Sequence, residues 1–387
     1  MSDLTTLLSE LVAIDSINPN FHSEQELAAD AHRGEAAIGV YLVRWLMEAG
    51  IETMVQSVAD GRLNVIGRVR GRGNGASLML NAHMDTVHVQ GMSAPFSPLL
   101  QEGRLYARGA YDMKSGLAAA LIALKNAKQM DLRGDVLVSA VIDEEYASIG
   151  TQALLAEWER WPADAVIVTE PTELEICIAH KGFHWLEIET IGRAAHGSRP
   201  HLGIDAIMKM GQVLMQLDQL DQNLRQLSPH PLLGTPSLHA GEISGGSGLS
   251  IYPATCVLGI ERRTLPGETA AIVEGQIKRI LDHLQKDDPD FKALFHTLLA
   301  QPPFSVDPDA AIVTHLQSGV QSVLQREVPL VGNSFWMDAA LFSEAGIPTV
   351  VFGPQGEGAH ADVEWVDMAS VEACAEIYTR LLASFCA

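Results

Sequence analysis

Cysteine is scarce in this sequence, and the four that occur are scattered. Cys177, Cys256, Cys374 and Cys386 form no CxxC pair within a chain of 387 residues. Small domains that rely on disulfides carry cysteines at a much higher density and at regular spacings. The sequence therefore predicts reduced, mostly buried thiols and excludes a disulfide framework.

Basic residues and long apolar runs are also missing. The chain has 26 Lys and Arg residues against 48 Asp and Glu, a net charge of −22, and no basic stripe. That balance argues against a nucleic-acid partner. No apolar run is long enough to cross a bilayer, and the N-terminus lacks the basic and apolar regions of a signal peptide. We expect a soluble cytoplasmic protein that binds neither nucleic acid nor membranes.

Apolar residues make up 47% of the chain, enough for a large core and for more than one domain. Strand and helix patterns alternate up to Glu170, which predicts an α/β fold with a mostly parallel sheet and helices on both faces. Gly50 is suited to the position just after a helix, because glycine adopts a left-handed conformation at low cost. The expected helices are 4–14, 24–49 and 113–130, and the expected strands are 52–58, 64–69 and a run that ends at Ala82.

The pattern changes near Gly182, where a strand–helix–strand–strand–helix–strand series begins. Its expected elements are 183–191, 204–224, 237–243, 255–262, 268–285 and 291–299. This order is that of a ferredoxin-like unit. The α/β pattern resumes after residues 301–303, with a helix at 309–324, a strand before His360 and a final helix. We therefore predict one domain built from residues 1–182 and 301–387, and an inserted α+β lid domain from residues 183–300.

Polar side chains follow several apolar runs that read as buried strands. His83 and Asp85 follow one run, Glu144 and Glu145 follow another, and Glu170 and His360 follow two more. In an open α/β sheet, ligands bind beyond the carboxyl ends of the strands. We expect one sheet edge to gather two imidazoles and several carboxylates.

Such a donor set suits two divalent cations, most readily Zn²⁺, with Mn²⁺ or Co²⁺ also compatible. Two neighbouring cations need a shared anionic ligand, and Asp112 at a helix start is the natural bridge. His83 and His360 would supply one nitrogen to each ion. Glu145 and Glu170 would complete the two ligand sets.

Two acidic residues are left for other tasks. Asp85 is near enough in sequence to fix the second ring nitrogen of His83. Glu144 is free to take a proton from a metal-activated water and to pass it to a leaving amine. The predicted reaction is metal-assisted hydrolysis of an amide or ester. Each motif alone has an ordinary structural reading as a turn, strand end or loop histidine, and it is their joint order that favours the metal site.

The sequence resembles the two-zinc exopeptidases and deacylases that include acetylornithine deacetylase, succinyl-diaminopimelate desuccinylase, aminoacylase and glutamate carboxypeptidase. The resemblance spans nearly the whole chain and is closest to the acetylornithine deacetylase-like members. It implies the same ligands and the same base, Glu144. The matching stretches are residues 81–87, 108–116, 143–145, 170–172 and 358–360.

The resemblance also implies roles inside the predicted lid. His196, in the stretch 192–200, would stabilise the tetrahedral oxyanion, often across a dimer interface. Arg263 would bind the substrate carboxylate through its guanidinium. Gly356 lies in the loop that the family places against the same carboxylate. A homodimer formed through the lid domain is likewise implied.

The chain departs from the family pattern at two places. Ser250 stands where many relatives carry an asparagine that contacts substrate, and its reach is shorter. Trp336 and Met337 stand where deacetylase relatives often carry smaller residues. They would either shape a bulkier, more apolar pocket or belong to the core.

We predict that the enzyme hydrolyses the amide bond of an N-acyl amino acid, a small substrate with a free carboxylate. The main alternative is a dipeptidase or a glutamate-type carboxypeptidase with the same site. A remote alternative is a non-catalytic binding protein, but no ligand and no base has been lost from the motifs.

Overall fold

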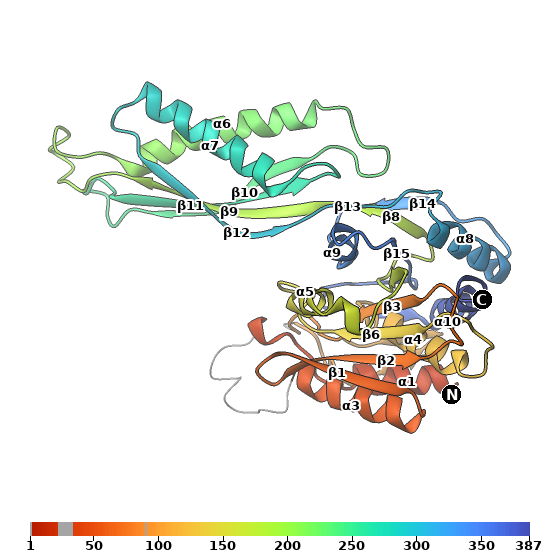
Figure 1. The fold of residues 1–387 in the computed structure, drawn as a ribbon. Coiled ribbons are helices and arrows are strands. Elements are labelled where there is room, and N and C mark those ends of the chain that lie inside the picture. The colour runs from red at the N-terminus through yellow and green to blue at the C-terminus, as the bar shows by residue number, and fades with distance from the viewer. Residues whose placement is uncertain (1, 22–33, 90) are drawn as a thin grey trace. The chain divides into compact units, whose positions relative to one another are not determined.

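The computed structural model describes residues 2–21, 34–89 and 91–387 (Figure 1). The chain forms two compact units. Unit 1 comprises Met1–Ile178, Val306–Val331 and Met337–Ala387, and unit 2 comprises Ala179–Ser305 and Gly332–Trp336. The predicted domain boundaries, near residues 182 and 301, require the chain to pass between the two domains twice. The short return of Gly332–Trp336 to unit 2 adds a second pair of crossings.

A nine-stranded mixed sheet carries the site, in the order β1-β2-β6-β3-β7-β15-β8-β13 with β14 beside β8. Its four central strands, β6, β3, β7 and β15, are mutually parallel, while β1, β2 and β8 pair antiparallel. The strands are β1 Glu52–Ala59, β2 Arg62–Val69, β3 Leu78–His83, β6 Val136–Val141, β7 Ala165–Val168, β8 Ile176–His180, β13 Phe304–Ser305, β14 Leu330–Asn333 and β15 Thr349–Val351.

The central strands have the burial that is typical of parallel strands. Every residue of β3, β6, β7 and β15 is buried, as expected for strands that are covered on both faces. In β1 and β2 the burial is interrupted by exposed or half-buried residues. The predicted α/β class is confirmed, and the antiparallel strands at the flanks make the sheet mixed.

Helices cover both faces of this sheet. Asn64 donates to the backbone of Gly150 in α5, while its neighbour Val65 lies against Gly39 in α3. Successive strand residues point to opposite faces, so α3 and α5 lie on opposite sides (Figure 1). Within the described residues, the helices of unit 1 are α1 Asp3–Val12, α3 Glu35–Glu48, α4 Lys114–Ala127, α5 Ile149–Ala156, α8 Ala311–Leu324, α9 Ala339–Glu344 and α10 Met368–Phe385, with short 3-10 turns η1 Pro19–Phe21 and η2 Trp158–Arg160.

Most predicted helix ends lie within a few residues of the observed ones. The helix expected over 24–49 is seen as α3, while the part of that prediction in residues 22–33 lies outside the described residues. Gly50 has a φ of 65° directly after this helix, as expected.

Unit 2 has the predicted ferredoxin-like order, β9-α6-β10-β11-α7-β12. Its four-stranded antiparallel sheet runs β10-β11-β9-β12. Along β9, buried residues alternate with more exposed ones, so one face packs on the helices and the other is open. The elements are β9 Gly182–Ile191, α6 Ala206–Arg225, β10 Ser237–Gly245, β11 Thr255–Thr264, α7 Ala270–Asp287 and β12 Ala293–Gln301.

A small third sheet, β16-β17-β5-β4, was not predicted. Its strands are β4 Leu99–Gln101, β5 Arg104–Tyr106, β16 Gly356–Glu357 and β17 Trp365–Asp367. Pairing of β17 with β5 joins the segment that precedes Asp112 to the segment that follows His360. Strands of two or three residues have too little periodicity to be read from sequence.

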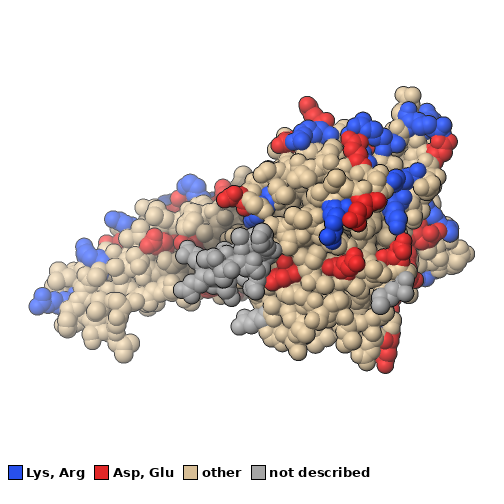
Figure 2. All heavy atoms as spheres, turned by 90° about the horizontal axis from the view of Figure 1, so that it is seen from below, with Lys and Arg blue, Asp and Glu red and all other residues tan. Residues whose placement is uncertain are grey.

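Acidic and basic side chains are interspersed on the surface that Figure 2 shows. Exposed ion pairs of this kind include Glu52 with Arg68 and Arg70, and Asp3 with Lys125. Within the described residues, no helix is both long and apolar enough to cross a membrane.

Candidate metal centre

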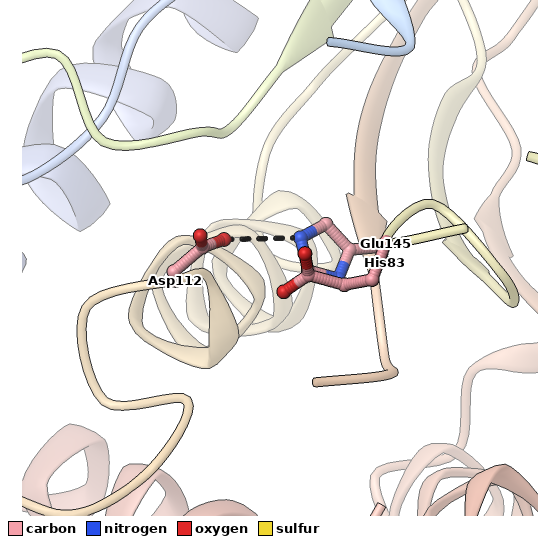
Figure 3. Close-up of side chains that lie close together, drawn as sticks. All are labelled: His83, Asp112 and Glu145. Carbon is pink, nitrogen blue, oxygen red and sulfur yellow. Dashed lines mark hydrogen bonds and ion pairs between the residues drawn. The ribbon is translucent and has the colours of Figure 1, made fainter. Parts of the chain in front are cut away.

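The donors gather where parallel strands end. His83 is the last residue of β3, Glu144 and Glu145 follow β6, and Glu170 follows β7. These three strands are hydrogen-bonded neighbours in parallel register, so their carboxyl ends meet at one edge. Asp112 precedes α4, and Figure 3 shows its carboxylate directed at the imidazole of His83, with Glu145 beside them.

Gly116 allows α4 to approach the end of β7. A Cβ atom at this position would lie only 2.0 Å from the carbonyl oxygen of Thr169. A larger residue would therefore push the start of α4 away from the strand that precedes Glu170. This close approach brings the helix that follows Asp112 against the strand end that precedes Glu170.

The two oxygens of Asp112 face different histidines. Oδ1 lies 3.2 Å from Nε2 of His83, and Oδ2 lies 3.4 Å from Nε2 of His360. Oε1 of Glu170 lies 3.4 Å from Nε2 of His83. Oε2 of Glu145 lies 2.9 Å from Nε2 of His360. Two donor groups, each with one imidazole and one glutamate, thus share one aspartate.

Glu144 lies at the margin of this cluster. Its Oε2 is 3.9 Å from Nε2 of His83, and its side chain is 11% exposed. In each of two groups of residues, the possible ligand atoms all lie within 4.8 Å of one another. One group is His83, Asp112 and Glu145, and the other is His83, Glu144 and Glu170. Glu144 is therefore placed to act either on a metal ion or on a water molecule near it.

Burial and crowding make the cluster electrostatically demanding. Burial is the main cause that raises the pKa of Glu144 and Glu170 well above the usual range, and neighbouring carboxylates add to it. The same effects raise the pKa of Glu145 to about 7. Burial opposes a charged His83, but Glu170 and Asp112 outweigh it and raise the pKa of this imidazole. A group of buried carboxylates is most stable when cations offset their charge.

Asp85 connects His83 to the segment that carries Glu144 and Glu145. Its two carboxylate oxygens accept hydrogen bonds from the backbone N–H groups of Glu144 and Glu145, both at 3.2 Å. Nδ1 of His83 lies 3.0 Å from the backbone oxygen of Asp85 and 3.4 Å from its Oδ1. Asp85 therefore orients three residues of the cluster: His83, Glu144 and Glu145. Only its contact with His83 was predicted from the sequence.

A second network supports the same loop and was missed by sequence reasoning. Asp143 has a φ of 70°, uncommon for a residue other than glycine, directly before Glu144. Its backbone N–H donates to Glu35 at 2.8 Å, and its carboxylate accepts from Arg62 at 2.6 Å and from Asn18 at 3.0 Å. These contacts hold the backbone in a sparsely populated conformation.

Glu364, also missed, ties the Asp112 loop to the His360 loop. It is 1% exposed and accepts hydrogen bonds from the backbone N–H groups of Gly109, Tyr111 and Asp112 at 2.9–3.1 Å. Arg108 donates to Glu364 at 2.7 Å and to the carbonyl of Ala361 at 3.0 Å. The position of Asp112 relative to His360 therefore depends on Glu364. Within the described residues, this carboxylate forms no hydrogen bond or ion pair with His83 or His360.

The remaining predicted residues are distributed between the two units. Gly356 is in unit 1, in β16, and its N–H donates to Glu173 at 3.1 Å. His196, Ser250 and Arg263 are in unit 2. The segments that carry His196 and Ser250 lie side by side. The N–H of Gly197 donates to the carbonyl of Ser250 at 2.7 Å, and His196 forms a β-bridge with Ile251. The His196 ring is exposed, and its Nδ1 forms a hydrogen bond of 2.8 Å with Oγ of Ser198.

An α/β sheet with a histidine–carboxylate cluster at its strand ends and an inserted ferredoxin-like unit defines a metal-dependent hydrolase. The chain belongs to peptidase family M20/M25/M40, whose family profile matches residues 79–384. The predicted family is therefore confirmed, and the protein is a hydrolase of that family.

Individual relatives agree with this placement. The chain is 30% identical over 390 residues to an acetylornithine deacetylase of Myxococcus xanthus, covering 99% of this chain and 97% of the relative. A metallo-carboxypeptidase of Sulfolobus solfataricus has the same fold with a TM-score of 0.80 at 19% identity, covering 100% and 99% of the two chains. A dinuclear metal-binding M20 peptidase of Bacillus subtilis superimposes with a TM-score of 0.74 at 17% identity, covering 98% and 96%.

Proposed function

We propose that unit 1 binds two divalent cations, most readily Zn²⁺, with Mn²⁺ or Co²⁺ as compatible substitutes. His83 and Glu170 would hold one ion, His360 and Glu145 would hold the other, and Asp112 would be shared by both. A buried oxygen of Glu145, Oε1, has no hydrogen-bond partner among the described residues, which fits a ligand atom. The observation that carries the proposal is that one aspartate faces two imidazoles.

Bound cations would polarise the scissile carbonyl and make water more acidic. Glu144 would take a proton from the attacking water at a carboxylate oxygen. As the carbon–oxygen bond forms and the carbon–nitrogen bond breaks, Glu144 would deliver that proton to the leaving amine nitrogen. Asp85 would keep the His83 ring and the Glu144–Glu145 backbone in position.

We assign substrate-binding roles to four other residues. His196 would donate a hydrogen bond to the developing oxyanion, and Arg263 would bind the substrate carboxylate. Ser250 and the loop at Gly356 would provide further polar contacts. These roles rest on the family motifs and on the chemistry of the side chains.

We infer that the substrate is an N-acyl amino acid, cleaved at its amide bond. The similarity to an acetylornithine deacetylase over nearly the full length of both chains supports a deacylase. A dipeptidase or carboxypeptidase activity would use the same residues, because the scissile bond is also an amide.

The test is a substrate panel with the metal-loaded full chain. N-acetyl, N-succinyl and longer N-acyl amino acids are compared with dipeptides, and release of free amino acid is measured. We expect hydrolysis of one N-acyl class, and loss of that activity after chelation and dialysis. Cleavage of dipeptides alone would overturn the deacylase assignment in favour of a peptidase.

We also propose a homodimer formed through unit 2. The edge strand β10 exposes Ile243, and α6 exposes Ile207, Met208 and Met215, with exposed fractions of 44–73%. Exposed apolar side chains beside an unpaired strand edge favour association with a second copy. Sedimentation velocity should give a dimer for the parent and a monomer for Met215→Glu combined with Ile243→Lys. A monomeric parent at micromolar concentration would refute the dimer.

A further inference from the structure

An aromatic cluster lies on the open face of the unit 2 sheet. The rings of Phe183 and Trp185, two residues apart on β9, have centroids 4.9 Å apart. The ring of Trp336 meets Phe183 edge-on at 6.1 Å. Trp185 is 39% exposed. All three residues belong to unit 2, so the cluster is formed within one compact part of the chain.

Hydrogen bonds fix the members of this cluster. Nε1 of Trp336 donates to the carbonyl of Pro302 at 3.0 Å. Nε1 of Trp185 donates to Glu261 at 2.8 Å. A large apolar side chain that is rigidly held and partly exposed is suited to bind a ligand at low entropic cost. Met337, by contrast, is 1% exposed and is a core residue of unit 1.

Arg263 is part of the same surface. It lies opposite Phe183 in the register of β11 and β9, and its guanidinium carbon is 5.5 Å from the centre of the Phe183 ring. Its Nε donates to Oε1 of Glu261 at 2.7 Å. The guanidinium is therefore oriented by an aromatic face and a carboxylate, and no hydrogen bond of its terminal nitrogens is found within the described structure.

The charges near the cluster disfavour a cationic ligand group. Both oxygens of Glu261 already accept hydrogen bonds, one from Trp185 and one from Arg263. Burial lowers the pKa of the Lys181 amine, and the nearby guanidinium charges of Arg263 and Arg262 lower it further. Farther along β9, Glu187 faces His296 at 3.5 Å. An ammonium group at the cluster would thus meet the like charges of Arg263 and Lys181, beside a Glu261 carboxylate whose two oxygens already accept hydrogen bonds.

We propose that this surface binds the side chain of the substrate's amino acid and selects aromatic or bulky apolar groups. The inference rests on the proposed function, in which Arg263 binds the α-carboxylate. The Phe183 ring lies against the Arg263 guanidinium, and the rings of Trp185 and Trp336 both lie next to the Phe183 ring. A planar side chain on the carbon that bears the carboxylate reaches these rings. The preferred substrates are therefore N-acyl aromatic amino acids, and N-acylornithine is a poor one.

The test compares kcat/KM of the metal-loaded full chain for N-acetylphenylalanine, N-acetylalanine and N-acetylornithine. We expect the aromatic substrate to be preferred over N-acetylornithine by at least about tenfold. Trp185→Ala should lower kcat/KM for N-acetylphenylalanine by about tenfold more than for N-acetylalanine, mainly through KM. Trp185→Phe should restore most of the loss.

A matched control variant is Leu294→Ala. Leu294 is 59% exposed and pairs with Glu189, four residues along β9 from Trp185. It should leave all three substrates unchanged. Preference for N-acetylornithine, or an equal loss on every substrate in Trp185→Ala, would overturn this inference while leaving the deacylase function intact. Hydrolysis of none of the three, and of none of their N-succinyl or longer N-acyl counterparts, would instead overturn the proposed function, and the inference with it.

Discussion

Glu144→Gln should lower kcat by about 10³-fold or more while the protein still binds its metal ions. The glutamine amide keeps the size of the side chain and a hydrogen-bonding oxygen, but it cannot accept the proton of an attacking water at neutral pH. Burial raises the pKa of Glu144 well above its usual range, and the neighbouring carboxylates add to this effect. Removing one negative charge should therefore leave the thermal midpoint at least as high as that of the parent protein. Steady-state kinetics and metal analysis after gel filtration measure the two effects.

The adjacent residue provides the control. Glu145→Gln changes the same functional group, but Glu145 faces His360 at 2.9 Å and is proposed to hold a metal ion. This variant should lose bound metal as well as activity, and added metal should restore part of the activity. A Glu144→Gln protein that behaves in the same way would show that Glu144 is a ligand, as its 3.9 Å distance from His83 also permits. Activity of Glu144→Gln near the parental level would exclude both roles.

The donors of the cluster were predictable because they follow strands with a strong sequence signal. β3, β6 and β7 are fully buried and mostly apolar, and the residue type at each carboxyl end is directly readable. Parallel neighbours then bring His83, Glu145 and Glu170 to one edge without further information. The ferredoxin-like order of unit 2 was predictable for the same reason, since its strands and helices are long.

The residues that support the cluster had no such signal. Glu364 accepts hydrogen bonds from the backbone of the Asp112 loop, and backbone donors look the same in every sequence. Glu35 and Arg62 meet Asp143 across large sequence separations, where an ion pair cannot be distinguished from ordinary surface charge. The position of Trp336 in unit 2 depends on a five-residue return of the chain, Gly332–Trp336. No hydrophobic periodicity in the sequence predicts this return.

The antiparallel flanks of the sheet illustrate a further limit. The segments of β1 and β2 read correctly as strands, but direction is set by the turn between them and by the partner strand. Glu52 pairs with Arg68, and Val65 pairs with Ala140, both antiparallel. A hairpin connection of a few residues forces the first reversal. The direction of β2 against β6 is a tertiary choice that residue patterns do not encode.

Asp112→Asn should remove the bridge and thereby the two-metal site. An asparagine retains one acceptor oxygen and no charge, so it cannot present an anionic oxygen to both His83 and His360 as Asp112 does at 3.2 and 3.4 Å. The two cations would then repel each other without a shared anion. We expect the metal content after gel filtration to fall from about two ions per chain to one or fewer, and kcat/KM to fall by about 10³-fold or more.

Loss of the bridge must be separated from a general loss of negative charge. Asp131→Asn is the matched control, because Asp131 is 76% exposed and pairs with Arg72 on the surface of unit 1. It should leave metal content and activity unchanged. Titration of the metal-free Asp112→Asn protein with Co²⁺, followed by visible absorption, reports binding without turnover. Two ions bound as tightly as in the parent would refute the bridge and would require the ions to be held by separate ligand sets. Binding of a single ion, with the thermal midpoint retained, would establish that Asp112 serves both histidines.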